Sequence, residues 1–315
     1  MNILITGHRG FVGNSLLGKL KSPENLIVGI SRSENKKYPT KYQADVELKG
    51  DIRDTHFLRR VITDYEIEEI YHFAAQSIIR TCANDPQSTF DIGVMGTVSL
   101  LEACRTPCST VKSITVSTSD KAFGHSEILP YNEKTPLNPL FTYETAKACQ
   151  QLITICYAKN YNVPTRVVAC SNIYGPGDYN MTRIIPNTIT RLAKGQKAQL
   201  NSGVANFVRE FVYIDDVTDA FIKVSRNGSS GEVYCCGGTG HDTISNIIKN
   251  ICNNMGKDFD KDVEQFQRAS QFKEIEKQYM NSTKLKSIGW NPKVSLNEGL
   301  KRTVEFYTEL VEKTK

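Results

Sequence analysis

The sequence lacks the features that mark several classes of protein. No apolar run approaches the roughly 20 residues of a membrane-spanning helix, so no membrane association is expected. The first residues form an apolar strand pattern, with no basic segment, apolar stretch and cleavage site, which predicts a cytoplasmic protein. The 39 basic and 34 acidic residues give a net charge of only +5, without a basic stripe interleaved with aromatics. Nucleic acid is therefore not an expected partner, and a small anionic ligand fits better.

The nine cysteines show no paired spacing of the kind that holds a metal ion. They are predicted to be reduced and mostly structural thiols, as is usual in the cytosol. No metal site is expected.

Short apolar runs alternate with helical patterns through about two-thirds of the chain. The predicted strands are Asn2–Thr6, Leu26–Ile30, Val46–Lys49, Glu69–Phe73, Lys112–Ser117 and Thr165–Ala169. The predicted helices are Gly10–Lys21, Asp54–Tyr65, Pro86–Arg105 and Phe141–Asn160. Buried strands that alternate with helices of this length predict an α/β fold with a Rossmann-type, doubly wound parallel sheet.

The pattern changes beyond Asn172. Strand-like pieces become shorter, at Phe207–Tyr213 and Val233–Cys236. Helical patterns return at Arg183–Lys194, Ile214–Ser225, Thr243–Asn254 and Leu296–Lys313. We therefore expect a dinucleotide-binding domain over residues 1–170, to which later segments return, and a smaller α/β lobe over residues 171–315 that mainly binds substrate.

A glycine-rich segment directly follows the first predicted strand. It reads Thr6-Gly7-His8-Arg9-Gly10-Phe11-Val12-Gly13. Its glycines allow a tight turn and a close backbone approach, and the helix that follows points its N-terminus at a pyrophosphate. A glycine-rich turn without a ligand is the alternative, but the strand–turn–helix context favours a dinucleotide site.

The end of the second predicted strand bears on the choice between NAD and NADP. An acidic residue there would bind the ribose 2′-hydroxyl, but the chain has Arg32 after Ser31. Arg32, with Arg9, could hold a 2′-phosphate, which favours NADP slightly; an Arg32 that stacks on adenine would suit either cofactor. Asp51 and Ile52, after the third strand, are expected to contact the adenine.

Tyr143 and Lys147 are four residues apart and lie on one face of the helix predicted over Phe141–Asn160. A neighbouring ammonium favours the phenolate form of a tyrosine, so Tyr143 is a plausible base for a sugar hydroxyl. Lys147 is also expected to bond the nicotinamide ribose. Taken alone, the pair is common on amphipathic helices, and the upstream glycine loop is what favours catalysis.

Stretches along almost the whole chain resemble the extended short-chain dehydrogenase/reductases that act on nucleotide sugars. They are Thr6–Gly13, Gly50–Asp54, His72–Gln76, Gly96–Val98, Ser117–Lys121, Tyr143–Lys147, Asn172–Asp178, Arg209–Val217 and Leu285–Trp290. The resemblance implies cofactor contacts at Ala74, Ala75 and Gln76 as well. It also implies a homodimer that pairs through the helices at Pro86–Arg105 and Phe141–Asn160.

Within that family, Ser119-Asp120-Lys121 is similar to the 4,6-dehydratases of the CDP-glucose and GDP-mannose type. The resemblance implies a lyase that moves hydride from C4 of a hexose to a tightly bound, recycled NADP or NAD and then to C6, with loss of water. Tyr143 would take the C4 hydroxyl proton, Ser119 would orient that hydroxyl, Asp120 would act as the acid and Lys121 as the base. The alternative to these catalytic roles is that Asp120 and Lys121 form a structural ion pair at the end of a strand.

We place Asn172, Arg183 and Arg209 around the nucleoside diphosphate, because arginine forks match phosphate oxygens. An ion pair of Arg209 with Asp215 or Asp216 is the alternative. Three other functions stay open: a 4-epimerase, a 5,6-dehydratase, and a non-catalytic dinucleotide-binding protein.

The chain departs from the family at Gly93, where the family commonly has an asparagine that supports the hydrogen bonds of the active site. This departure bears on the proton relay and leaves the prediction of a dinucleotide cofactor unchanged.

Overall fold

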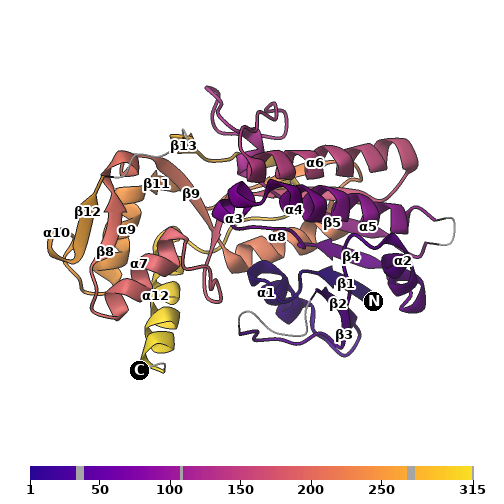
Figure 1. Cartoon of the computed structure of the whole chain (residues 1–315), viewed down its shortest axis with the longest axis horizontal. Coiled ribbons are helices and arrows are strands. Elements are labelled where there is room, and N and C mark those ends of the chain that lie inside the picture. Colours follow the sequence, from indigo (N-terminus) through magenta and orange to yellow (C-terminus); the bar gives the residue numbers. More distant parts are fainter. Residues whose placement is uncertain (33–38, 107–108, 268–273, 314–315) are drawn as a thin grey trace. The chain divides into compact units, whose positions relative to one another are not determined.

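The apolar runs of the first 170 residues are the strands of one parallel sheet (Figure 1). The computed structural model describes residues 1–32, 39–106, 109–267 and 274–313. The strands of this sheet are β1 (Asn2–Thr6), β2 (Leu26–Ser31), β3 (Val46–Lys49), β4 (Glu69–His72), β5 (Ser113–Ser119), β6 (Thr165–Cys170) and β10 (Val233–Cys236). Their order is β10-β6-β5-β4-β1-β2-β3, and every neighbouring pair is parallel. Because β1 lies between β2 and β4, the winding direction reverses at β1, where doubly wound sheets bind ligands.

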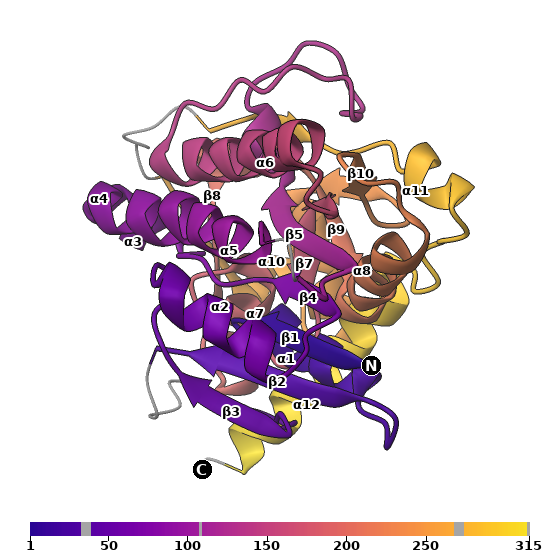
Figure 2. The same ribbon diagram turned by 90° about the vertical axis from the view of Figure 1, so that its right-hand side faces the viewer.

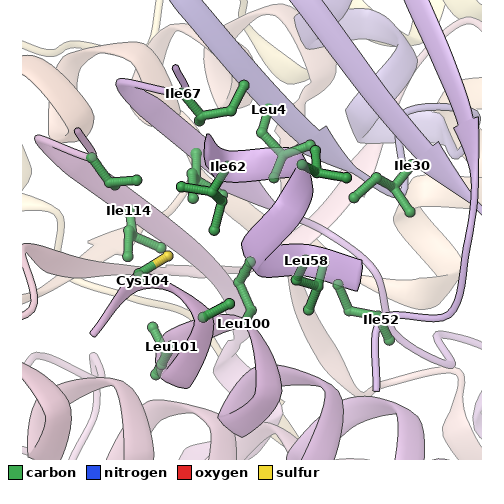
Figure 3. Packing of buried hydrophobic residues seen from close by; sticks show 14 of the residues in the cluster. Leu4, Ile30, Ile52, Leu58, Ile62, Ile67, Leu100, Leu101, Cys104 and Ile114 are labelled. Atoms are coloured by element: carbon green, nitrogen blue, oxygen red, sulfur yellow. The ribbon is translucent and has the colours of Figure 1, made fainter. Parts of the chain in front are cut away.

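Helices cover both faces of this sheet (Figure 2). They are α1 (Phe11–Leu20), α2 (Thr55–Asp64), α5 (Gly96–Cys104), α6 (Thr142–Tyr161) and α8 (Ile214–Asn227). Helices α1 and α8 lie side by side, joined by an ion pair of 2.5 Å between Lys19 Nζ and Asp219 Oδ1. Helices α2, α5 and α6 cover the opposite face, where Leu58, Ile62 and Leu100 pack on the strands (Figure 3). The apolar faces of these helices therefore form one continuous core with the sheet.

The predicted helix Pro86–Arg105 is interrupted. It consists of α4 (Pro86–Phe90), a π-helical turn (Asp91–Met95) and α5. The Thr97 hydroxyl donates to the Gly93 carbonyl at 2.6 Å across the end of this turn. A short helix α3 (Ile79–Asn84), a 3₁₀ turn (Asp120–Phe123) and α11 (Thr283–Ser287) complete the helices that belong with the parallel sheet. Such short elements carry too little periodicity to be predicted from the sequence.

The chain forms two compact units. The first comprises Met1–Cys170, Val217–Cys236 and Asn281–Asn291, and the second comprises Ser171–Asp216, Gly237–Met280 and Pro292–Lys315. The segment Val217–Cys236 returns to the first unit because it supplies most of α8 and the edge strand β10. The parallel sheet confirms the predicted Rossmann-type α/β fold.

The second unit is built around β9 (Val208–Tyr213). Strands β7 (Asn172–Tyr174) and β13 (Lys277–Gln278) pair with β9 in parallel, and β11 (His241–Thr243) pairs with it antiparallel. A separate parallel pair joins β8 (Ala198–Asn201) to β12 (Val263–Phe266). The helices of this unit are α7 (Ile184–Ala193), α9 (Ile244–Asn254), α10 (Phe259–Asp262) and α12 (Leu296–Glu312), with a 3₁₀ turn at Ser202–Val204.

Eight of the nine cysteines lie within the described residues, and all eight are free thiols, as predicted; Cys108 lies outside the described residues. Across the described ranges, no helix combines the length and the apolar character needed to cross a bilayer.

Candidate active site

The loop between β1 and α1 requires glycine at positions 7 and 13 of the motif. Gly7 has φ of +72°, and a Cβ added to it would lie 3.0 Å from the Ala74 amide nitrogen. A Cβ on Gly13 would lie 2.4 Å from the Gly7 carbonyl oxygen. The Gly10 amide closes the turn by donating to the same oxygen at 2.9 Å. The backbone is therefore packed against itself and leaves its outer side to a ligand.

Helix α1 begins at Phe11 without a capping side chain and without an acidic residue in its first turn. Phe11 and Val12 are half-buried. The first amide groups of a helix have no partner within the helix, and an anion is attracted to them. The residues present thus fit the pyrophosphate of a nicotinamide dinucleotide.

Two residues of the glycine loop contact Glu47 on β3. Arg9 Nη2 forms an ion pair with Glu47 Oε2, and His8 Nε2 lies 3.5 Å from Glu47 Oε1. Burial lowers the pKa of His8, and its Nδ1 lies 3.1 Å from the Ile30 carbonyl. Glu47 and His8 were not among the residues predicted for this site. A glycine inside a strand, Gly29, could have indicated that another group approaches the strand closely at this point. A Cβ on Gly29 would lie 2.6 Å from the His8 ring.

Asp51 is held by Arg53. Its carboxylate accepts from Arg53 Nε at 3.0 Å and from Nη2 at 2.7 Å. These bonds, with smaller contributions from the Arg53 amide and from the charge of Arg32, lower the pKa of Asp51. Arg32 is exposed. Ile52 is buried in the core, with only 3% of its surface exposed, so its backbone alone is left for a contact with adenine.

The segment after β4 lies against the start of the glycine loop. The Ala74 amide donates to Thr6 Oγ1 at 3.3 Å, and Thr6 immediately precedes Gly7. Ala74, Ala75 and Gln76 are half-buried, and Gln76 Oε1 accepts from the Ile78 amide at 3.3 Å. The structure therefore brings the two predicted cofactor segments together.

Lys147 is a buried cation. Its Nζ donates to the Ser117 carbonyl of β5 at 2.9 Å, and 7% of the residue is exposed. Burial lowers the pKa of Lys147 to about 8. Tyr143, one turn earlier on α6, is half-buried. The N-terminus of α6 is fixed by Glu144, whose carboxylate accepts from the Leu140 and Phe141 amides.

Ser119, Asp120 and Lys121 form the transition from β5 to a 3₁₀ turn. The Ser119 hydroxyl donates to Asp120 Oδ1 at 3.0 Å and accepts from the Lys121 amide at 3.3 Å. Asp120 is 2% exposed, whereas Lys121 is half-buried. Helix α6 packs against both β5 and this turn. The structure thus brings the five predicted catalytic residues onto adjoining elements of one unit.

The residues predicted to bind the nucleoside diphosphate belong to the second unit, whereas Ser119, predicted to orient the sugar hydroxyl, belongs to the first. Asn172 Nδ2 donates to the Glu210 carbonyl at 3.0 Å. Arg183 precedes α7 and pairs with the buried Asp178 at 3.0 Å; burial outweighs this partner and raises the pKa of Asp178. Arg209 is 7% exposed, and its Nη2 lies 3.5 Å from Glu274 Oε2. Arg209 is therefore a buried cation with an acidic neighbour that the sequence did not reveal.

The model of the family described as GDP-mannose 4,6 dehydratase matches residues 4–303. The chain belongs to this family. Over 319 aligned residues it is 28% identical to a trifunctional UDP-glucose 4,6-dehydratase/UDP-4-keto-6-deoxy-D-glucose 3,5-epimerase/UDP-4-keto-L-rhamnose-reductase of Arabidopsis thaliana. The match covers 98% of this chain and 47% of the plant enzyme, so the chain spans about half the length of that relative.

Solved structures similar to this chain include both dehydratases and epimerases. A UDP-glucose 4-epimerase from Thermotoga maritima superposes with a TM-score of 0.90 at 26% identity, covering 99% of this chain and 100% of the epimerase. A dTDP-glucose 4,6-dehydratase from Bacillus anthracis, solved with NAD, superposes with a TM-score of 0.85 at 28% identity. The match covers 98% of this chain and 97% of the dehydratase. The chain therefore shares its fold with both dehydratases and epimerases of nucleotide sugars.

Proposed function

We propose that this chain is a nucleotide-hexose 4,6-dehydratase, a hydro-lyase that converts an NDP-hexose to an NDP-4-keto-6-deoxyhexose. One observation carries the proposal: Asp120 and Lys121 follow the strand whose Ser117 carbonyl holds Lys147. Removal of water needs an acid and a base in addition to the groups that serve hydride transfer. Asp120 and Lys121 supply that second pair beside Tyr143 and Lys147.

The proposed reaction assigns a proton-transfer or positioning role to each of these residues. Tyr143 takes the proton of the C4 hydroxyl, which Ser119 orients, and the charge of Lys147 favours the phenolate. Lys121 then removes the C5 proton, which the C4 ketone has made acidic, while Asp120 protonates the C6 hydroxyl so that it leaves as water. Lys121 later returns a proton to C5. A bound NAD or NADP supplies the chemistry of accepting hydride from C4 and delivering it to C6. Each positioned acid or base typically contributes about 10²–10⁴ in rate.

The nucleoside diphosphate is assigned to Asn172, Arg183 and Arg209. Arg209 supports this role because it is a buried cation whose fork-shaped guanidinium suits phosphate oxygens. Its Nη1 donates to the Val208 and Glu276 carbonyls, and its Nη2 lies 3.5 Å from the Glu274 carboxylate.

A 4-epimerase is the second candidate, favoured by the likeness to the Thermotoga maritima enzyme. An epimerase returns hydride to C4 and leaves the C6 hydroxyl in place, so it has no use for Asp120 and Lys121 as an acid–base pair. The two candidates therefore differ in the mass of the product.

Mass spectrometry of the purified protein with CDP-, GDP-, UDP- and dTDP-hexoses tests the proposal. The expected result is the loss of one water from one of these sugars, without net reduction of the cofactor. A product of unchanged mass and altered configuration would establish the epimerase and reject the dehydratase.

Two variants then test the assigned roles. Lys121→Ala should still form the 4-ketone but lose no water, whereas Tyr143→Phe should block the first hydride transfer and keep cofactor binding. Lys134→Ala, at an exposed lysine of the following loop, is the matched control. Full turnover by Lys121→Ala would show that Lys121 is not the base.

We also propose a homodimer that pairs through the helical stretch Pro86–Cys104 and α6. Met95 and Leu152 on these helices are 50% and 57% exposed, which supports an apolar contact surface. Leu152→Glu should produce monomers in light scattering, whereas Ile128→Glu, at an exposed residue outside these helices, should not. A monomeric wild-type protein would contradict this assembly.

A further inference from the structure

A chain of buried hydrogen bonds runs across the sheet face that α5 and α6 cover. Thr6 Oγ1 lies 2.8 Å from His72 Nδ1, and His72 Nε2 lies 3.0 Å from Thr97 Oγ1. Gln150 Nε2 donates to the same Thr97 oxygen at 2.9 Å. All four residues are at most 1% exposed, so water cannot substitute for these bonds.

The directions of the bonds to Thr97 follow from its hydroxyl proton. Its hydroxyl gives its only proton to the Gly93 carbonyl at 2.6 Å, so it must accept from both His72 and Gln150. His72 therefore carries a proton on Nε2. Burial lowers the pKa of His72 to about 3, so the ring is neutral and its Nδ1 accepts from the Thr6 hydroxyl. Thr6 in turn accepts from the Ala74 amide at 3.3 Å.

The chain joins the predicted cofactor segments to the predicted catalytic helix. Thr6 and Ala74 adjoin the glycine loop, while Gln150 lies one helical turn beyond Lys147. Lys147 is close enough to His72 for its charge to lower the pKa of His72 further. Cys82 and Cys170 also lie close enough to Lys147 to influence its pKa, and Tyr143 lies one turn before it on α6. A neutral His72 leaves Lys147 as the cation of this buried group.

We propose that Thr97 is a positioning residue, whose hydroxyl fixes the helix carrying Tyr143 and Lys147 relative to the strand ends that bear the cofactor loop. The turnover part of this inference rests on the proposed function, but the cofactor part does not. Loss of the hydroxyl leaves the His72 and Gln150 donors buried without an acceptor, and both segments shift. A displacement of about 1 Å in catalytic groups can lower turnover about 100-fold.

The test compares Thr97→Val, which removes the hydroxyl at nearly constant volume, with Thr97→Ser, which keeps it. Thr303→Val is the matched control, because Thr303 is equally buried in a helix and donates to Gly299 at 2.6 Å. Titration calorimetry should show that Thr97→Val binds NAD and NADP about tenfold more weakly than the wild type, whereas Thr97→Ser and Thr303→Val keep the affinity of the wild type. Nitrogen-15 NMR should show a neutral, Nε2-protonated His72 in the wild type and in Thr97→Ser, and loss of that signature in Thr97→Val.

Turnover gives the second readout. Thr97→Val should lower kcat about 10- to 100-fold, and Thr97→Ser should recover most of it. If Thr97→Val does not fold, Gln150→Met tests the proposal instead. This variant removes only the hydrogen bond between Gln150 on α6 and Thr97, so it should lower kcat while the affinity for the cofactor stays unchanged. The proposal would be overturned if Thr97→Val kept its cofactor affinity and kcat within twofold of the wild type. It would also be overturned if Thr303→Val lost as much of both. A wild type that binds cofactor but turns over no sugar would reject the proposed function and leave the calorimetric test intact.

Discussion

Replacing Lys147 by methionine should make the protein more stable and inactive at the same time. The pKa of Lys147 is lowered from 10.5 to about 8, chiefly because burial disfavours its charged form. Each pKa unit corresponds to about 1.4 kcal/mol, so a protonated Lys147 reduces the free energy of unfolding by about 3 kcal/mol. Methionine removes that penalty but also the hydrogen bond to the Ser117 carbonyl, which offsets about 1–2 kcal/mol. The net gain expected at pH 7 is about 1–2 kcal/mol.

The stability advantage of Lys147→Met should decrease as the pH rises. Below pH 8, Lys147 is protonated in both the folded and the unfolded chain, and the full penalty applies. As the pH rises from about 8 toward 10.5, the folded state loses this proton first, so the wild type becomes more stable through this group. The advantage of Lys147→Met should therefore be greatest below pH 8 and should shrink toward pH 10.

Urea unfolding followed by fluorescence measures this difference in the relevant unit. The single tryptophan, Trp290, is buried and belongs to the same unit as Lys147. Lys159→Met is the control, because Lys159 lies on the same helix but is exposed. A Lys147→Met variant that is less stable than the wild type at pH 7, or whose advantage is unchanged at pH 10, would refute the argument from burial.

Three further predictions concern the cofactor loop. Gly13→Ala forces a Cβ to within 2.4 Å of the Gly7 oxygen and should weaken NAD binding in calorimetry about tenfold, whereas Gly240→Ala, where nothing lies within 4 Å, should not. Equal affinities in the two variants would contradict this packing. Glu47→Gln removes the ionic partner of Arg9 and should raise the ratio of NADP to NAD affinity about fivefold; an unchanged ratio would mean that Arg9 does not reach the 2′-phosphate. Gly29→Ala should displace the His8 ring and weaken binding of both dinucleotides by a similar factor, which the same titration measures; unaltered binding would show that His8 does not shape the loop.

Much of the fold of the first unit could be predicted from the sequence. The strands β1 and β3 occupy the predicted residues, because buried parallel strands appear as continuous apolar runs. The predicted helix Asp54–Tyr65 is α2 with its two capping residues, and Asp54 accepts from the Phe57 amide. The strands β7, β11 and β13 were not predicted, since two or three residues carry no periodic signal and depend on β9 for their pairing.

The candidate site was predictable where its residues are close in sequence. The glycine loop was recognised from its spacing between a strand and a helix, and the Tyr143–Lys147 pair from its spacing together with that loop; the structure places both in one unit. The contacts between distant residues were not predictable, because they depend on strand register. Glu47 reaches Arg9 because Gly29 on β2 pairs with Glu47 on β3, and a register shift of one residue would direct that carboxylate to the other face.

In the proposed reaction Lys147 acts as a buried cation, and its burial reduces the stability of the fold. A lysine that must stay charged near a phenol has to be dehydrated when the chain folds, and its neighbours must not add further positive charge. Burial of His72 meets this second condition, since it lowers the pKa of the ring and keeps it neutral, and Thr97 accepts the hydrogen bond of its Nε2–H. His72 thus contributes hydrogen bonds at both ends without a charge. A permanently charged residue at position 72 would raise the cost of burying Lys147, and for this reason the end of β4 suits a histidine better than a lysine or an arginine.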